Sequence, residues 1–160
     1  MQNYEKEVKI ALDSDTTVVI TRFIPAPQEL AFDAWSQCKH IQKWMSGPPG
    51  WTMPHCEMDL RAGGAYRWGW RKEDGEEIFI TGVYKEVDRP NRLVSTESWG
   101  GNWAESLNTM TFTPDGEGTM FKLVMEFPTK EARDAGLETG MGDSMQMGFD
   151  SLDAYLSSLS

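Results

Sequence analysis

Cysteine and histidine are scarce in this sequence, with two residues of each among 160. Cys38 and Cys56 are too few for a disulfide scaffold, and a chain of this length buries about 70% of its unfolded surface without one. The pairs Cys38–His40 and His55–Cys56 lack the C-x₂₋₄-C and H-x₃₋₅-H spacings of structural zinc sites. We therefore expect these four residues to be unlinked and to bind no metal.

Long apolar runs and an excess of basic charge are also missing. No stretch approaches the roughly 20 apolar residues of a membrane span, and the N-terminal MQNYEKEVKI lacks a signal-peptide pattern. Lys and Arg number 15 against 25 Asp and Glu, which gives a formal net charge of −10. Such a charge is repelled by phosphate backbones and anionic lipids. We expect a cytoplasmic protein that neither binds nucleic acid nor inserts into a membrane.

Common catalytic signatures are absent as well. The sequence contains no G-x-S-x-G elbow, no G-x-x-x-x-G-K-[ST] loop and no H-E-x-x-H helix. Glu57, Asp59, Tyr84 and Glu97 could supply acid or base groups if buried, although carboxylates on antiparallel strands usually face water. No catalytic residue is assigned, and no cofactor is expected.

Strand-like runs and turns occupy most of residues 1–127. Val8, Ile10 and Leu12 alternate, so residues 1–15 form either an extra edge strand or a flexible N-terminus. TVVITRF at 17–23 is β-branched, and two short helices follow at about 28–35 and 39–44. Six further runs, at about 52–59, 64–72, 77–87, 92–99, 104–113 and 118–127, are joined by turns too short for parallel crossovers. These patterns predict an antiparallel meander.

One long C-terminal helix is predicted from about Thr129 to Ser158, with Thr129 as N-cap and Glu131 in the first turn. Its apolar stripe consists of Leu137, Met141, Met145, Phe149, Leu152, Leu156 and Leu159. Only this helix is long enough to cover one face of the strands. We predict an α+β helix-grip fold, a curved antiparallel sheet of about seven strands around that helix, in a single domain spanning 1–160.

Alternating aromatic residues indicate a binding cavity. Tyr66, Trp68 and Trp70 share one strand face, where they either fill the core or wall a pocket. Methionines on the last helix and on later strands suit adaptable apolar sites, although they also fill ordinary cores. We predict a cavity between helix and sheet, whose wall is Tyr66, Trp68, Trp70, Ile80, Tyr84, Met110, Phe112, Phe121, Leu123, Met141, Met145 and Phe149.

Several motifs together resemble a known family. They are Pro25-Ala26-Pro27, Phe32, Trp35, Trp44, GPPGWTMP at 47–54, Glu57, DLRAGGAYRW at 59–68, Gly82-Val83-Tyr84, Arg89-Pro90-Asn91-Arg92-Leu93 and TFTPDGEGT at 111–119. From about residue 17 to 157 the chain is similar to bacterial proteins that resemble the C-terminal domain of the activator of the 90-kDa heat-shock chaperone ATPase. This group belongs to the START-like, birch-pollen-allergen-like (SRPBCC) superfamily.

The resemblance implies seven strands gripping a C-terminal helix, with two short helices after the first main strand. Relatives often hold a hydrophobic ligand between helix and sheet, and the name-giving activator contacts a chaperone in the stress response. Since a fold does not determine function, three hypotheses follow. The first is a non-enzymatic module for a small apolar or amphipathic ligand. The second is a protein-interaction module that activates a chaperone ATPase, and the third is a cavity enzyme of cyclase or hydrolase type. A homodimer is one option for the oligomeric state.

Overall fold

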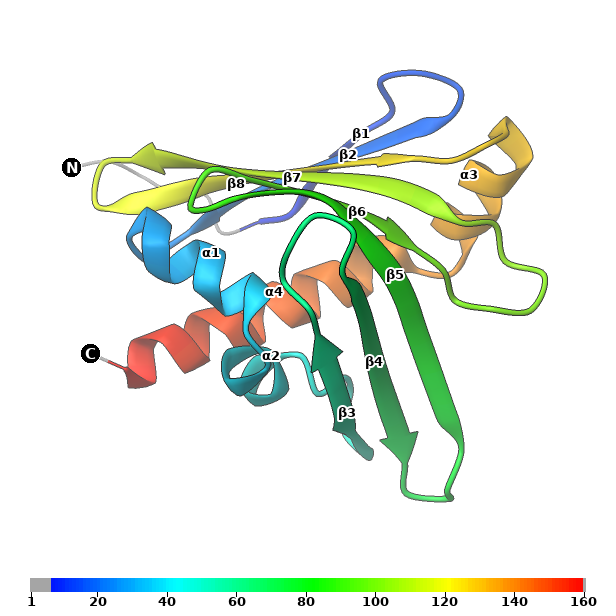
Figure 1. Cartoon of the computed structure of the whole chain (residues 1–160), viewed down its shortest axis with the longest axis horizontal. Coiled ribbons are helices and arrows are strands. Elements are labelled where there is room, and N and C mark those ends of the chain that lie inside the picture. The colour runs from blue at the N-terminus through cyan, green and yellow to red at the C-terminus, as the bar shows by residue number, and fades with distance from the viewer. Residues whose placement is uncertain (1–6, 160) are drawn as a thin grey trace.

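Residues 7–159 are described by the computed structural model, and they form one curved antiparallel sheet with four helices (Figure 1). The sheet order is β1-β2-β8-β7-β6-β5-β4-β3. The strands are β1 (Lys9–Ala11), β2 (Thr17–Ile24), β3 (Trp51–Met58), β4 (Ala65–Lys72), β5 (Glu77–Asp88), β6 (Arg92–Glu97), β7 (Ser106–Asp115) and β8 (Gly118–Glu126). The helices are α1 (Gln28–Ser36), α2 (Cys38–Trp44), α3 (Lys130–Glu138) and α4 (Met141–Ser158).

The α+β helix-grip prediction is confirmed. The strand beyond the predicted seven is β1, which pairs with β2 at the sheet edge, as the alternation of the N-terminal segment allowed. Residues 1–6 of that segment lie outside the described residues. None of the helices in residues 7–159 is long and apolar enough to cross a lipid bilayer.

The concave side of the sheet, called the inner face here, carries the core. In β2, Val18, Ile20 and Ile24 are buried at alternating positions, as a half-buried strand requires. The same alternation buries Arg22, which the sequence analysis did not single out. Its guanidinium donates to both carboxylate oxygens of Asp153 on α4, at 3.1 and 2.7 Å. A charged pair therefore joins the C-terminal helix to the sheet.

The C-terminal helix does not cover the inner face alone, and this corrects the prediction. α1 and α4 both lie on the concave side (Figure 1). The ring of Trp35 on α1 stacks on Phe121 of β8 at 4.8 Å, and Phe149 of α4 meets the same Phe121 ring at 5.4 Å. The proline-led helix after β2 is thus part of the core, because its aromatic residues reach the same strands.

The single helix predicted from 129 to 158 is two helices. Thr129 is the N-cap of α3, as predicted, and its Oγ1 accepts a hydrogen bond from the amide of Ala132 at 3.0 Å. α3 ends at Glu138, and α4 starts at Met141 after Gly140, whose φ is +83°. That left-handed conformation cannot continue a right-handed helix, and glycine adopts it at little cost.

Replacing Gly140 and Gly148 by alanine should change the free energy of unfolding in opposite directions. Gly140→Ala should lower the free energy of unfolding by about 1–2 kcal/mol, since a Cβ penalises a left-handed backbone. Gly148→Ala should raise it by about 1 kcal/mol, because Gly148 lies inside α4 and a Cβ there meets Trp44 at an ordinary 3.9 Å. Urea unfolding of both variants measures the difference, and equal signs would contradict the helix break.

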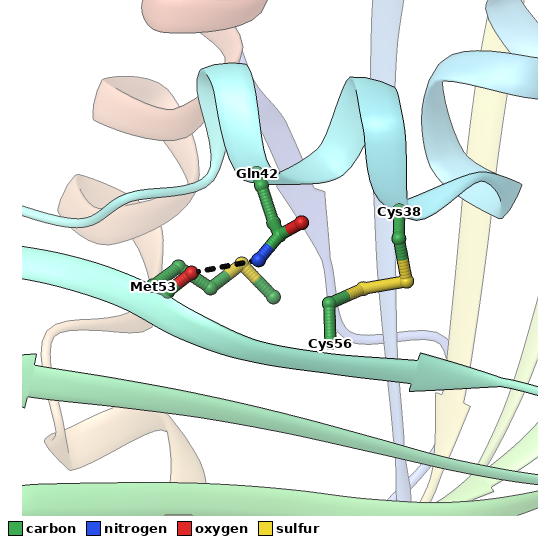
Figure 2. The surroundings of a disulfide bond; sticks show 4 residues. All are labelled: Cys38, Gln42, Met53 and Cys56. Atoms are coloured by element: carbon green, nitrogen blue, oxygen red, sulfur yellow. Dashed lines mark hydrogen bonds between the residues drawn. A yellow bond between two sulfur atoms is a disulfide. The ribbon is translucent and has the colours of Figure 1, made fainter.

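The prediction of unlinked cysteines is wrong. Cys38, the first residue of α2, forms a disulfide with Cys56 of β3, and their Cα atoms are 5.8 Å apart (Figure 2). Gln42 of α2 also donates to the carbonyl of Met53 on β3 at 3.0 Å. The sequence could not show this link, because 18 residues and a tight loop separate two cysteines that the fold places side by side.

The two histidines have partners of their own. His40 Nδ1 lies 2.6 Å from the hydroxyl of Tyr155, and His55 Nε2 lies 3.1 Å from a carboxylate oxygen of Glu77. Within residues 7–159 no three His, Cys, Asp or Glu side chains gather closely enough to hold a metal ion. The former zinc candidates are therefore divided among a disulfide and two separate polar contacts.

Candidate functional site

The inner face changes from polar to apolar along the strands. On β7 the inward side chains are Ser106, Asn108, Met110 and Phe112, all of them buried. At about 3.4 Å per residue, Ser106 and Phe112 are about 20 Å apart. The space between helices and sheet therefore has a polar end and an apolar end.

The apolar end is filled by aromatic side chains. Phe112 meets Phe32 of α1 at 5.2 Å between ring centroids and Phe121 at 5.4 Å. Trp35 and Phe149 close over Phe121 from the two helices. Phe149 is 1% exposed. This part of the predicted cavity wall is packed core in the structure.

The polar end carries five inward residues, which we call the polar cluster: Tyr84, Ser95, Glu97, Ser106 and Asn108. Strand pairing places Tyr84 opposite Ser95, Ser95 opposite Asn108, and Glu97 opposite Ser106. Directly opposite residues of antiparallel strands share a face with Cβ atoms about 5 Å apart. The register of β5, β6 and β7 thus brings together five side chains from three strands.

A chain of hydrogen bonds ends on the Glu97 carboxyl group. The Ser106 hydroxyl donates to Asn108 Oδ1 at 2.9 Å, and Asn108 Nδ2 donates to Glu97 Oε2 at 3.1 Å. Burial raises the pKa of Glu97 above its usual range, and the hydrogen bonds from Asn108 and Ser106 offset part of that rise. Glu97 is thus a carboxyl group at the sheet's inner face that is held by neutral donors.

Three aromatic rings meet at the polar end of the inner face, and Tyr66 is the one nearest to Glu97. The ring of Tyr66 is 4.9 Å from that of Trp68 and 5.2 Å from that of Tyr84. The Tyr66 hydroxyl donates to the carbonyl of Thr96 at 2.6 Å, next to Glu97 in the chain. Burial raises the pKa of both tyrosine hydroxyls above its ordinary value.

Two polar atoms at this end are buried without a hydrogen-bond partner among residues 7–159: Tyr84 Oη and Trp68 Nε1. Tyr84 is 2% exposed and Trp68 is 7% exposed. Leaving such a group unsatisfied costs about 1–3 kcal/mol, so native proteins usually supply a partner. Trp35 Nε1 and Arg22 Nε are also unpartnered, but they lie at the apolar end or in the Arg22–Asp153 pair.

Two hollows on the described part of the chain lie elsewhere. One is open and lies on the outward side of α4, between Asp143 and Ala154. The other lies where the Pro25–Pro27 turn and α1 meet the end of α4. A ligand at the polar cluster would therefore need side chains to move. The half-buried Met141 and Met145 of α4 pack on the core, and methionine adapts its shape readily.

The remaining residues of the predicted cavity wall lie in two places, the core and the rim of the fold. Ile80, Met110 and Leu123 are buried in the core. Trp70 is half-buried and donates from Nε1 to the carbonyl of Met45 at 2.7 Å, which fixes it to the segment after α2. Its other neighbour is the exposed Trp99, stacked at 6.2 Å. Trp70 thus belongs to the rim of the fold.

Of the four acid or base candidates, two lie on the inner face. Glu97 and Tyr84 are in the polar cluster, whereas Glu57 and Asp59 are exposed. Asp59 instead pairs with Arg61 at 2.9 Å. The expectation that strand carboxylates face water holds for Glu57 and Asp59 and fails for Glu97.

Ser95, Ser106 and Asn108 were not predicted from the sequence as site residues. A signal for them exists: in SLNTMTFT, Ser106 and Asn108 share the parity of Met110 and Phe112, and Ser95 shares that of Leu93. Polar residues at buried parity point to a hydrogen-bonded network in the core, because burying them unpaired is costly.

Comparison with known proteins adds a family and a fold. The family described as Activator of Hsp90 ATPase homolog 1-like protein matches residues 25–157. No curated protein matches the sequence.

Solved structures cover nearly the whole chain. A protein from Rhodobacter sphaeroides is 27% identical with a TM-score of 0.90, over 95% of this chain and 99% of that one. Protein Ms6760 from Mycobacterium smegmatis is 25% identical with a TM-score of 0.82, over 93% and 96%. The AHSA1-like protein from Aeromonas hydrophila, at 19% identity and a TM-score of 0.72 over 86% and 92%, shares the fold.

Proposed function

The chain belongs to the family of Activator of Hsp90 ATPase homolog 1-like proteins, and from this premise we propose that it is a non-enzymatic module that binds a small amphipathic ligand. The ligand would lie between the C-terminal helix and the inner face of the sheet. The observation that carries the proposal is the pair of buried, unpartnered polar atoms, Tyr84 Oη and Trp68 Nε1, which belong to the two rings that contact Tyr66 at the polar end of the inner face.

The two ends of the inner face support an amphipathic ligand over a purely apolar one. Polar groups of the ligand would meet Tyr84, Trp68 and Glu97. Its apolar part would extend toward Met110 and the half-buried Met145. Ligand sites in proteins are mostly apolar with a few placed polar groups, which is the composition of this region.

A protein-interaction role is the second candidate. Trp99 and Trp103, in the loop between β6 and β7, are 47% and 52% exposed. Exposed tryptophans are often partner contacts, because they bury much apolar area on binding. A chaperone is the partner that the family's description suggests. In this role the contact surface would be the loop with Trp99 and Trp103 and not the inner face.

An enzymatic role is the third candidate, and we assign no reaction step to it. Glu97 is half-buried, and desolvation raises the pKa of its carboxyl group, a shift that catalytic acids often show. Tyr84 lies on the same inner face, and burial raises the pKa of its hydroxyl group. Structural carboxyl groups in hydrogen-bonded networks show the same shift, so a binding role accounts for these groups equally well.

The proposed function predicts that decan-1-ol binds the protein with a Kd on the order of micromolar, because burial of its chain is largely offset by association costs. Met145→Trp should weaken this binding about tenfold by filling space under α4. Met147→Trp is the matched control, since Met147 is 45% exposed on the same helix. Isothermal titration calorimetry measures both. Failure of decan-1-ol to bind, or equal loss in the two variants, would overturn the proposal.

A further inference from the structure

The Glu97 carboxyl group lacks a positive partner. None of the ion pairs among residues 7–159 includes Glu97. Its contacts are the neutral donors Asn108 and Ser106. A carboxylate removed from water is normally paired with a cation or takes up a proton. A ligand cation would satisfy this group directly.

The unpartnered atoms of Trp68 and Tyr84, whose rings contact Tyr66 at the same end of the inner face, require a second type of group. Trp68 Nε1–H can only donate, so its partner must carry an acceptor atom. The Tyr84 hydroxyl can donate or accept. A complementary ligand therefore presents N–H donors with positive charge to Glu97 and an acceptor oxygen to Trp68 or Tyr84.

The aromatic rings favour the same charge. Trp68, Tyr66 and Tyr84 are neighbours at 4.9 and 5.2 Å, and Tyr66 is fixed to the backbone next to Glu97. A cation over an aromatic ring is attracted by the electron-rich face of the ring. Rings and carboxylate together form the type of surface that recognises alkylammonium groups.

We propose that the ligand of the polar cluster is an apolar amino alcohol or related amine, whose ammonium group pairs with Glu97 and whose oxygen meets Trp68 or Tyr84. This inference rests on the proposed function, since it names the ligand class of the same site. It also favours an amine over a fatty acid as the ligand. A fatty-acid carboxylate would stand beside Glu97 with like charge, and Glu105 adds to the negative field acting on Tyr66.

Four ligands with the same ten-carbon chain separate the alternatives: 2-aminodecan-1-ol, decylamine, decan-1-ol and decanoic acid. Calorimetry should find 2-aminodecan-1-ol tightest, decylamine next and decanoic acid weakest. Glu97→Gln should cost 2-aminodecan-1-ol tenfold or more in affinity and cost decan-1-ol much less, because only the amine loses a charge-assisted hydrogen bond while the shape is kept.

The matched control for charge is Glu57→Gln, an exposed glutamate on β3 whose loss changes the net charge equally. It should leave all four affinities unchanged. Tyr84→Phe is a second variant that should fold at least as stably, since it removes an unsatisfied hydroxyl, yet bind 2-aminodecan-1-ol about fivefold more weakly.

Three results would overturn the inference. Decan-1-ol binding with no preference for the amines would refute the ligand class and leave the proposed function intact. Equal loss in Glu97→Gln and Glu57→Gln would show only surface attraction between amines and an acidic protein. Absence of binding by all four compounds would refute the inference and the proposed function together.

Discussion

Asp153→Ala should lower the free energy of unfolding by about 3–5 kcal/mol, because it removes the hydrogen-bonded counter-charge of a buried cation. The Arg22 side chain is fully buried, and both carboxylate oxygens of Asp153 accept from it. The Arg22 guanidinium also lies 5.3 Å from the Phe149 ring. Urea or thermal unfolding followed by circular dichroism measures the loss.

Asp150→Ala is the matched control on the same helix. Its carboxylate lies 3.6 Å from Arg22 and its side chain is 62% exposed, so its loss should cost about 0–1 kcal/mol. The double change Arg22→Met with Asp153→Leu should recover most of the stability, since apolar residues replace a buried ion pair at little cost. Equal losses of unfolding free energy for Asp153→Ala and Asp150→Ala would contradict the role of Asp153 as the main counter-charge of Arg22.

Replacing both Cys38 and Cys56 by Ser should cost about 3 kcal/mol, the loop-closure value for a crosslink across 18 residues of sequence. For a domain of this size the midpoint of thermal unfolding should fall by about 6–12 °C. The disulfide ties α2 to β3 (Figure 2), and Cys56 pairs across the strands with Trp68 of the candidate site.

Dithiothreitol provides the control for this prediction. It should lower the midpoint of the parent protein to that of the double variant and leave the variant unchanged. Gln42→Ala, which removes the other α2–β3 contact shown in Figure 2, should cost only about 1 kcal/mol. An unchanged parent midpoint after verified reduction would refute a stabilising disulfide. Disulfides persist mainly in oxidising compartments, so this bond counts against the cytoplasmic location, which remains a prediction.

Strand and helix positions were predicted from local patterns within a few residues. β2 was expected at 17–23 and spans Thr17–Ile24, and β4 was expected at 64–72 and spans Ala65–Lys72. Alternation, turn residues and the Thr129 cap are local signals, so they survive without knowledge of the fold. The break at Gly140 was missed because the apolar stripe continues across it, although the glycine itself was noted as weakening the helix.

The candidate site was predicted in part. The inward direction of Tyr66, Trp68 and Tyr84 follows from strand parity, but parity alone does not show which groups lack a partner. Glu97 was expected to face water, and Ser106 and Asn108 were not predicted as site residues. These three residues form one cluster only because β6 pairs with β7 in a register that sets their polar residues opposite each other. Whether a buried polar atom lacks a hydrogen-bond partner depends on residues that are close in space, so only the tertiary structure shows it.

By itself, the sequence determined the class of the fold, the order of its elements and one face of each strand, because periodicity and turn chemistry act over a few residues. Tertiary structure alone decided the Cys38–Cys56 disulfide, the burial of Arg22 against Asp153, the filled apolar end and the polar cluster around Glu97. Each of these depends on distances between residues far apart in the chain. Those distances are set by how the sheet curves and where the helices cross it.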